Sequence, residues 1–413
     1  MRSVALQMQV VYAKNLFLTY SGHSRIMTES GSRRYDYLVQ LAGQLGDDAL
    51  VVTNLANTAT EWFAARPSDG NLYAVGMGMV TAYALGLALA LPDREVVALD
   101  GDGGVFFDAS LLGLLATRKV TKLRVIVFDN GGYISTGRLP VVGSLSSQGV
   151  NIAEVARGFG MTDIVTVSDV PAFANAVRKP SLGPQLIVVR VSAEQAFVGA
   201  LPMDLKENKY RFVRHIERSE GRHILKPSAK EHGAKPVADP QGATIGDGGF
   251  ARVLHEGLKE NGVDFAVGLP CSGFAAAQEL LMTDDAIDYV GVAHEGTGIW
   301  LCAGAWLAGR RPVALIENFG LFASAYHLLR GHMSFGLPTL IVTEFRGDTG
   351  DQEFFAEGGE VTLDVLTAMR INHRLITRLE DVKPAIRDAL RWMDGCLRPF
   401  ALEPSYELTR LKA

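Results

Sequence analysis

Two short polar motifs stand where a protein built on a parallel sheet would bind a charged ligand. Gly101-Asp102-Gly103 follows the apolar run 96–100, and Asn130-Gly131-Gly132 follows a second apolar run, 123–129. Both runs are typical of buried strands, and the residues between them predict one helical crossover over 107–118. Open α/β sheets bind ligands at the carboxyl ends of their strands. A carboxylate, an amide oxygen and a backbone carbonyl at that edge suit a hard cation such as Mg²⁺, which commonly also binds phosphate.

The glycines of the first motif favour a phosphate ligand, because they let the backbone approach it closely. The alternative is a glycine-rich turn beside an unrelated loop asparagine. Gly246-Asp247-Gly248 is a second copy of the motif, but no apolar strand precedes it. Alanines, not an asparagine, occupy the same downstream spacing at 275–277. We interpret the second copy as a loop.

The first motif pair, with Tyr133 three residues after Asn130, resembles the diphosphate-anchoring motif of thiamine-diphosphate (ThDP) enzymes. The resemblance implies that Asp102, Asn130 and the carbonyl of Gly132 bind Mg²⁺. It also implies a set of cofactor contacts: Gly101, Gly103, Gly104, Tyr133, Met77, Gly78, Asn57 and Thr58.

Met77 matches the apolar side chain that holds the cofactor bent in this family, although ordinary core packing would also explain a methionine there. Asn57 and Thr58 follow the predicted strand 49–54. Ala56 stands where the family usually has a glycine, so this segment departs from the family pattern.

Composition and charge exclude several classes of partner. A net charge of −5, with both signs interspersed, gives no reason to expect nucleic acid or an anionic membrane. The three cysteines, Cys271, Cys302 and Cys396, have no metal-type spacing, and their odd number disfavours a disulfide framework. The sequence contains no charge-free run of eighteen apolar residues, so it predicts no transmembrane helix. We expect a cytoplasmic protein, with residues 1–31 as an N-terminal extension.

Strand-like and helix-like segments alternate in both halves of the chain, which predicts an α/β fold of two domains, each a mostly parallel sheet flanked by helices. We expect a diphosphate-binding domain over 32–199 and a pyrimidine-binding domain over 249–413. Residues 200–248 are rich in charged residues, Pro and Gly, so we interpret them as a linker.

Glu295 is the candidate activating carboxylate of the second half. His294-Glu295-Gly296 lies between the predicted strand 287–293 and the predicted helix 295–308. In ThDP enzymes a glutamate at such a junction bonds N1′ of the aminopyrimidine and favours the imino form that activates the cofactor. The alternative is a first-turn glutamate that the helix dipole favours.

Across about 380 residues the chain resembles sulfopyruvate and phosphonopyruvate decarboxylases, with the diphosphate domain first instead of second. The matching segments in the second half include 268–272, 294–296, 318–321 and Arg346-Gly347. The resemblance implies these substrate-pocket residues: Cys271, Ser272, His294, Asn318, Phe319, Phe322, His327 and Arg346.

The predicted pocket departs from that family in its polarity. Phe319 and Phe322 replace small residues, and Phe354 and Phe355 replace a polar run. A sulfonate or phosphonate requires donors and positive charge. Phenylalanines suit an apolar or aryl 2-oxo acid, although phenylalanines in helices are more often core residues.

We therefore expect a ThDP- and Mg²⁺-dependent enzyme that decarboxylates a 2-oxo acid. The favoured reaction is carboligation, with an aldehyde or acyl-thioester as the acceptor. The alternative is a simple decarboxylase that releases an aldehyde. Two further rivals are a non-catalytic ThDP-fold protein and a nucleotide-binding α/β protein, but no P-loop or Rossmann glycine spacing is present. We expect a homodimer or homotetramer in which Glu295 faces Asp102 of another chain.

Overall fold

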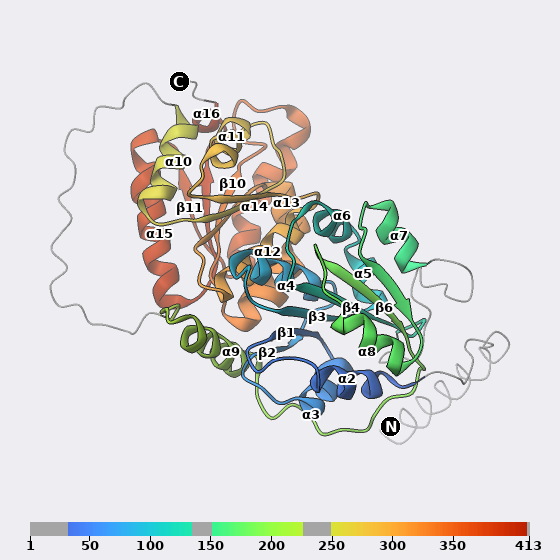
Figure 1. Cartoon of the computed structure of the whole chain (residues 1–413). Helices are drawn as coiled ribbons and strands as arrows, with labels where there is room; N and C mark the ends of the chain where they lie inside the picture. Colours follow the sequence, from blue (N-terminus) through green and yellow to red (C-terminus); the bar gives the residue numbers. More distant parts are fainter. Residues whose placement is uncertain (1–31, 134–150, 226–248, 411–413) are drawn as a thin grey trace, which may run out of the picture.

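The computed structural model describes residues 32–133, 151–225 and 249–410 (Figure 1). Three predictions lie outside these ranges: the extension over 1–31, the second Gly-Asp-Gly copy, and the part of the expected linker over 226–248. None of the helices in the described ranges is long and apolar enough to cross a membrane.

The first half is a six-stranded parallel sheet in the order β2-β1-β3-β4-β6-β5. Its strands are β1 (Leu50–Asn54), β2 (Asn71–Val75), β3 (Val96–Gly101), β4 (Leu123–Asp129), β5 (Ile164–Val167) and β6 (Gln185–Arg190). Its helices are α2 (Arg34–Ala42), α3 (Asn57–Ala65), α4 (Val80–Ala90), α5 (Asp102–Phe107), α6 (Ser110–Thr117), α7 (Ile152–Gly158) and α8 (Val170–Arg178). The predicted helix over 107–118 corresponds to α6, and a separate short helix that was not predicted, α5, precedes it, because the backbone leaves the helical conformation at Asp108.

The second half is also a six-stranded parallel sheet, in the order β11-β12-β10-β9-β7-β8. Its strands are β7 (Phe265–Gly268), β8 (Asp288–Gly291), β9 (Pro312–Glu317), β10 (Leu340–Glu344), β11 (Asn372–Ile376) and β12 (Phe400–Pro404). Its helices are α10 (Phe250–Glu260), α11 (Ala275–Thr283), α12 (Glu295–Leu307), α13 (Asn318–Ala323), the π-helix η2 (His327–Met333), the 3₁₀ helices η3 (Glu353–Phe355) and η4 (Leu379–Asp381), α14 (Ala356–Ala368), α15 (Val382–Cys396) and α16 (Tyr406–Thr409). The two halves confirm the predicted α/β class.

Part of the expected linker is a packed helix. Residues Leu205–Glu220 form α9, which lies against β2. Asn208 accepts a hydrogen bond from the backbone amide of Tyr73 (2.7 Å) and donates one to the carbonyl of Asn71 (3.0 Å). We therefore propose that the first domain continues through α9, instead of ending at residue 199.

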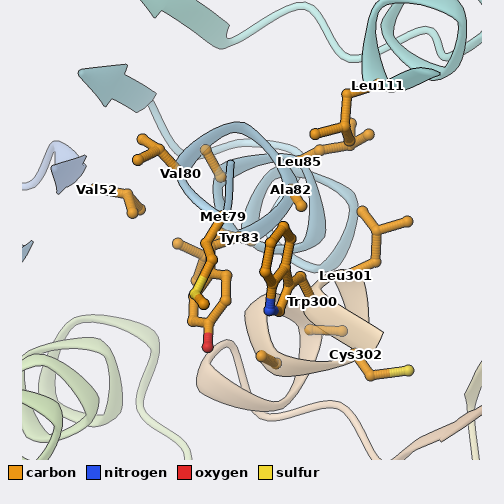
Figure 2. Close-up of a cluster of buried hydrophobic side chains, with 14 of the residues drawn as sticks. Val52, Met79, Val80, Ala82, Tyr83, Leu85, Leu111, Trp300, Leu301 and Cys302 are labelled. Atoms are coloured by element: carbon orange, nitrogen blue, oxygen red, sulfur yellow. The ribbon is translucent and has the colours of Figure 1, made fainter. Parts of the chain in front are cut away.

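Helices α4 and α12 join the two halves (Figure 1). Almost every residue of both helices is buried, and Figure 2 shows Tyr83 and Leu85 of α4 beside Trp300 and Leu301 of α12. Glycines allow the two backbones to approach closely. A Cβ added at Gly86 would lie 2.4 Å from the carbonyl oxygen of Leu301, and one added at Gly304 would lie 2.2 Å from that of Tyr83.

The Gly304→Ala variant should lose stability, because its new methyl group meets backbone that cannot move aside. We expect a loss of about 1–3 kcal/mol, typical of overpacking, in urea denaturation. Gly395→Ala is the matched control. It lies in α15, and a Cβ there meets nothing within 4 Å. That variant should gain about 0.5–1 kcal/mol, so equal stability of the two variants would contradict the close helix contact.

Candidate active site

Asp102 begins α5 at the carboxyl end of β3, beside the loop that follows β4. Its side chain is 4% exposed. Oδ1 accepts a hydrogen bond from the amide of Gly103 (2.8 Å), whereas Oδ2 is sealed from solvent and has no partner among the described residues. Burial, followed by the nearby Asp129 carboxylate, raises the pKa of Asp102 to about 7, against the effect of the hydrogen bond from Gly103.

The structure brings the three predicted metal ligands to one edge of the sheet. β3 and β4 pair in register to their ends, and Asn130 turns back so that its Oδ1 accepts a hydrogen bond from the amide of Gly132 (3.1 Å). In the described ranges no group of three or more His, Cys, Asp or Glu side chains is placed to hold a metal. A cation here would therefore depend on the amide and carbonyl oxygens beside Asp102. The unpaired Oδ2 of Asp102 fits such a cation.

Asp100 organises this edge, and the sequence patterns did not predict that role. Its Oδ1 accepts hydrogen bonds from the side chain of Asn54 (2.8 Å) and the amide of Gly101 (2.9 Å), and Oδ2 accepts one from Thr81 (3.2 Å). A Cβ at Gly104 would lie 2.0 Å from Asp100 Oδ1, so this glycine is required. The only sequence signal was a carboxylate ending an apolar strand.

The other predicted cofactor contacts lie around the same edge. A Cβ at Gly103 would lie 2.5 Å from the ring of Tyr133, and Gly78 has a left-handed backbone (φ 80°) against Phe107. Met77 is half-buried, and its carbonyl accepts a long hydrogen bond from the Tyr326 hydroxyl (3.5 Å) of the second half.

The turn that leads to Asn57 and Thr58 keeps the backbone of the missing glycine. Ala56 has φ 59° and ψ −134°, a region that glycine favours. Asn57 starts α3, and Thr58 is buried within it. The chain therefore holds an alanine under backbone strain where the family has glycine.

The Ala56→Gly variant should gain about 1 kcal/mol of stability, because glycine adopts this backbone without strain. Thermal or urea unfolding would measure the gain. Ala64→Gly, on the exposed face of α3, is the control and should lose roughly 0.5–1 kcal/mol. A loss in both variants would show that Ala56 is not strained.

Glu295 is the first residue of α12 and is 9% exposed. Its carboxylate packs against Gly320, where an added Cβ would lie 2.4 Å from Oε1. Two residues on, the Thr297 hydroxyl donates a short hydrogen bond to the Asp108 carboxylate of the first half. The N-terminus of α12 therefore meets the segment that follows Asp102.

That contact bears on the expected assembly. The α4–α12 packing and the Thr297–Asp108 bond bring two half-sites, the Asp102 edge of the first sheet and the Glu295 end of α12, together within one chain. The expectation that Glu295 faces Asp102 of another chain stays a prediction, and a site within one chain is its alternative. A second bridge reinforces this, because Arg330 of η2 donates a hydrogen bond to the carbonyl of Ala74 (3.3 Å). The fold does not require a second chain to bring the half-sites together.

His294 and His327 flank Glu295. The rings lie 5.2 Å apart, and that of His327 stacks 4.0 Å from Trp300. Burial, with smaller effects of His294 and His332, lowers the pKa of His327 to about 3, so its ring is neutral at pH 7. Its Nδ1 has no hydrogen-bond partner in the described part of the chain. His332, by contrast, is tied to the carbonyls of Leu337 and Ile299 and is structural.

Two of the predicted pocket residues are held by other protein groups. Arg346 donates hydrogen bonds from Nε and Nη2 to the two oxygens of Asp351 (2.8 and 2.9 Å), and its guanidinium lies 3.6 Å from the Phe355 ring. The buried Asn318 donates hydrogen bonds to the carbonyl of Arg346 (2.8 Å) and to Thr362 (2.9 Å). Asn318 therefore positions the Arg346 loop.

Cys271 and Ser272, after β7, lie beside the buried Glu344 at the end of β10. Burial, followed by the charge of Glu344, raises the pKa of the Cys271 thiol, so this residue is not a thiolate nucleophile. Ser272 and Arg410 both donate hydrogen bonds to Glu344 Oε1 (3.5 and 3.0 Å). No local sequence pattern marked Glu344 or Arg410, because strands far apart in the chain bring them together.

Comparisons with known proteins match large parts of the chain. Residues 52–191 match the family model "Thiamine pyrophosphate enzyme, C-terminal TPP binding domain". The sulfopyruvate decarboxylase subunit beta of Methanocaldococcus jannaschii is 25% identical over 45% of this chain and 98% of its own length. The subunit alpha of Methanothermobacter thermautotrophicus is 31% identical over 30% of this chain and 76% of its own. The phosphonopyruvate decarboxylase of Streptomyces viridochromogenes is 32% identical over 35% of this chain and 37% of its own length.

Solved structures share the fold at low sequence identity. Transketolase from Campylobacter jejuni superimposes with a TM-score of 0.62 at 14% identity, over 90% of this chain and 73% of its own. Benzoylformate decarboxylase from Polynucleobacter necessarius superimposes with a TM-score of 0.54 at 11% identity, over 92% of this chain and 99% of its own.

Proposed function

Because the chain belongs to the ThDP-dependent enzymes of the sulfopyruvate and phosphonopyruvate decarboxylase group, we propose that it decarboxylates a 2-oxo acid without oxidation and releases an aldehyde. The observation that carries this proposal is the pairing of two half-sites: the unpartnered carboxylate oxygen of Asp102 and the buried Glu295 lie on halves joined by α4 and α12. The sequence favoured carboligation first, but the names of the relatives favour the decarboxylase.

Each half of the site has its own task. Asp102, Asn130 and the carbonyl of Gly132 would hold Mg²⁺, and through it the cofactor diphosphate. Glu295, shielded from water, would hold the proton at N1′ of the aminopyrimidine. Met77 would support the bent cofactor. When bound, ThDP supplies a nucleophilic carbon for the keto group and accepts the electron pair that CO₂ leaves behind.

The direct test incubates the purified protein with ThDP, Mg²⁺ and a panel of 2-oxo acids. We expect CO₂ release with an aldehyde as the product, read by mass spectrometry. Adding an aldehyde or acyl-thioester acceptor tests the carboligase alternative, since a coupled product would appear at the expense of the free aldehyde. Absence of CO₂ release from every acid, together with absence of ThDP binding, would refute the proposal.

A hybrid experiment tests the arrangement within one chain, whether or not the chain forms the homodimer that we expect. Co-expressed Glu295→Gln and Asp102→Ala chains should give no more activity than either variant alone, because every site would contain one defect. The hybrid should be purified with two different affinity tags. Activity well above that of both parent variants would contradict a site within one chain and support a site shared between two chains.

A further inference from the structure

An aromatic face lies beside Glu295. We define the aromatic face as Phe319, Phe322, Phe354 and Phe355. Phe319 contacts both Phe322 and Phe355 (ring centroids 5.7 Å apart in each pair), and Phe354 stacks on Phe355 at 3.9 Å. The chain thus forms one continuous aromatic surface from α13 to η3.

One contact connects this face to the candidate active site. Phe319 directly precedes Gly320, the residue against which the Glu295 carboxylate packs. On its other side, Phe319 is pressed against Gly358 of α14, where an added Cβ would lie 2.4 Å from its ring. The face is nevertheless open to solvent, since Phe354 is 69% exposed and Phe319 is 39% exposed. Exposed rings next to a reactive site are suited to an apolar part of a ligand.

Two arginines of this region are already paired with carboxylates. Asp351 takes two hydrogen bonds from Arg346 and further ones from the amides of Gly347 and Gln352 (both 2.8 Å). Although burial opposes ionisation, these bonds lower the pKa of Asp351 to about 2, so the ion pair persists throughout the neutral range. Arg410 is similarly paired with Glu344, and it also donates a hydrogen bond to Ser272 (3.1 Å).

Carboxyl groups outnumber the cations at the strand ends. Glu317 ends β9, in register with Glu344 at the end of β10. Glu317 interacts electrostatically with Glu344, Arg346, Glu295 and Asp351, and burial together with Glu344 raises its pKa. Among the residues that the structure describes here, a sulfonate or phosphonate would lose its hydration without gaining a free positive charge.

We propose that the 2-oxo acid used by this chain carries an uncharged aryl or branched alkyl group at C3, which packs on the aromatic face, in place of a sulfonate or phosphonate. The inference rests on the proposed function and names its substrate class. In the sequence, the phenylalanines alone already favour an apolar or aryl 2-oxo acid. The engaged state of Arg346 and Arg410 makes the anionic alternative unfavourable.

The test compares kcat/KM for phenylpyruvate and 4-methyl-2-oxopentanoate with kcat/KM for 3-sulfopyruvate and 3-phosphonopyruvate, using the ThDP- and Mg²⁺-loaded enzyme. We expect kcat/KM to be higher for the apolar acids by about 10²-fold or more, because the complex with a sulfonate or phosphonate would leave a charge unpaired. Phe354→Ser should raise KM for phenylpyruvate and leave KM for pyruvate unchanged. Phe197→Ser is the matched control, because Phe197 is fully exposed in the first half.

A second pair of variants tests the electrostatic part. Glu317→Gln and Asp351→Asn each remove one carboxylate, and each should raise the relative kcat/KM for 3-phosphonopyruvate, whatever its absolute rate. Using two variants guards against one failing to fold. If the enzyme binds ThDP and prefers 3-sulfopyruvate or 3-phosphonopyruvate, this inference is overturned while the proposed function stands. If it binds no ThDP and turns over no acid, the proposed function itself fails.

Discussion

The Glu295→Gln variant should bind ThDP with nearly normal affinity and lose turnover by about 10²-fold or more, as expected when an acid–base group is removed. Glutamine has the same shape and can still form a hydrogen bond, so the buried position against Gly320 is preserved. It cannot carry the proton that the carboxyl group shares with the cofactor ring. Turnover should therefore fall without a matching fall in binding.

Calorimetric titration with ThDP, alongside CO₂ release, separates these two effects. Glu357→Gln is a suitable control, because Glu357 is an exposed first-turn glutamate of α14. If the only role of Glu295 were a favourable interaction with the helix dipole, Glu295→Gln and Glu357→Gln would each lose at most about 0.3–1 kcal/mol of stability and keep full turnover. Full activity of Glu295→Gln would remove Glu295 from the activating role.

The parts of the fold that could be predicted are those with a strong local pattern. β3 and β4 are apolar runs that end in glycine-containing motifs, so both their burial and the ligand edge follow from the sequence. Helix α4 is apolar on every side and must be buried. Its partner α12 is similar, but nothing local indicated that the two helices pack on each other within one chain.

The parts that were missed depend on distant contacts. Charged residues dominate α9 and conceal the buried stripe of Phe212, Val213 and Ile216, so the segment resembles a linker until β2 is in place. Strand β11 is half-exposed at the sheet edge and lacks a continuous apolar run.

The candidate site shows the same division. The residue types and spacing of Asp102 and Asn130 are local features of the sequence that favour a cation site, and the role predicted for Glu295 comes from the resemblance to ThDP enzymes. The ion pair of Arg346 with Asp351 depends on the loop conformation, and the Glu317–Glu344 pair depends on the register of β9 and β10. Sequence spacing therefore indicated a cation and phosphate site, and the resemblance to ThDP enzymes implied the cofactor, whereas the charge balance around the substrate emerged only from the packing.

The Asp102→Ala variant should lose measurable ThDP binding, and treatment of the wild-type protein with a chelator should do the same. Without the carboxylate, the site keeps only an amide and a carbonyl oxygen, which hold Mg²⁺ poorly. The diphosphate would then face this edge without its counter-ion. Calorimetric titration with ThDP, in the presence and absence of added Mg²⁺, measures the loss directly and does not depend on the substrate.

The fold of Asp102→Ala should survive, because the side chain contributes little to it. Oδ2 has no partner among the described residues, and a buried carboxylate without one destabilises a protein more than it supports it. The melting temperature of the variant should therefore match or exceed that of the wild type in the absence of ligand. Asp247→Ala, in the second Gly-Asp-Gly copy, should bind ThDP normally. Unchanged ThDP affinity in Asp102→Ala would show that Asp102 is not a metal ligand. Loss of affinity in both variants would contradict the prediction that only the first Gly-Asp-Gly copy binds the cofactor.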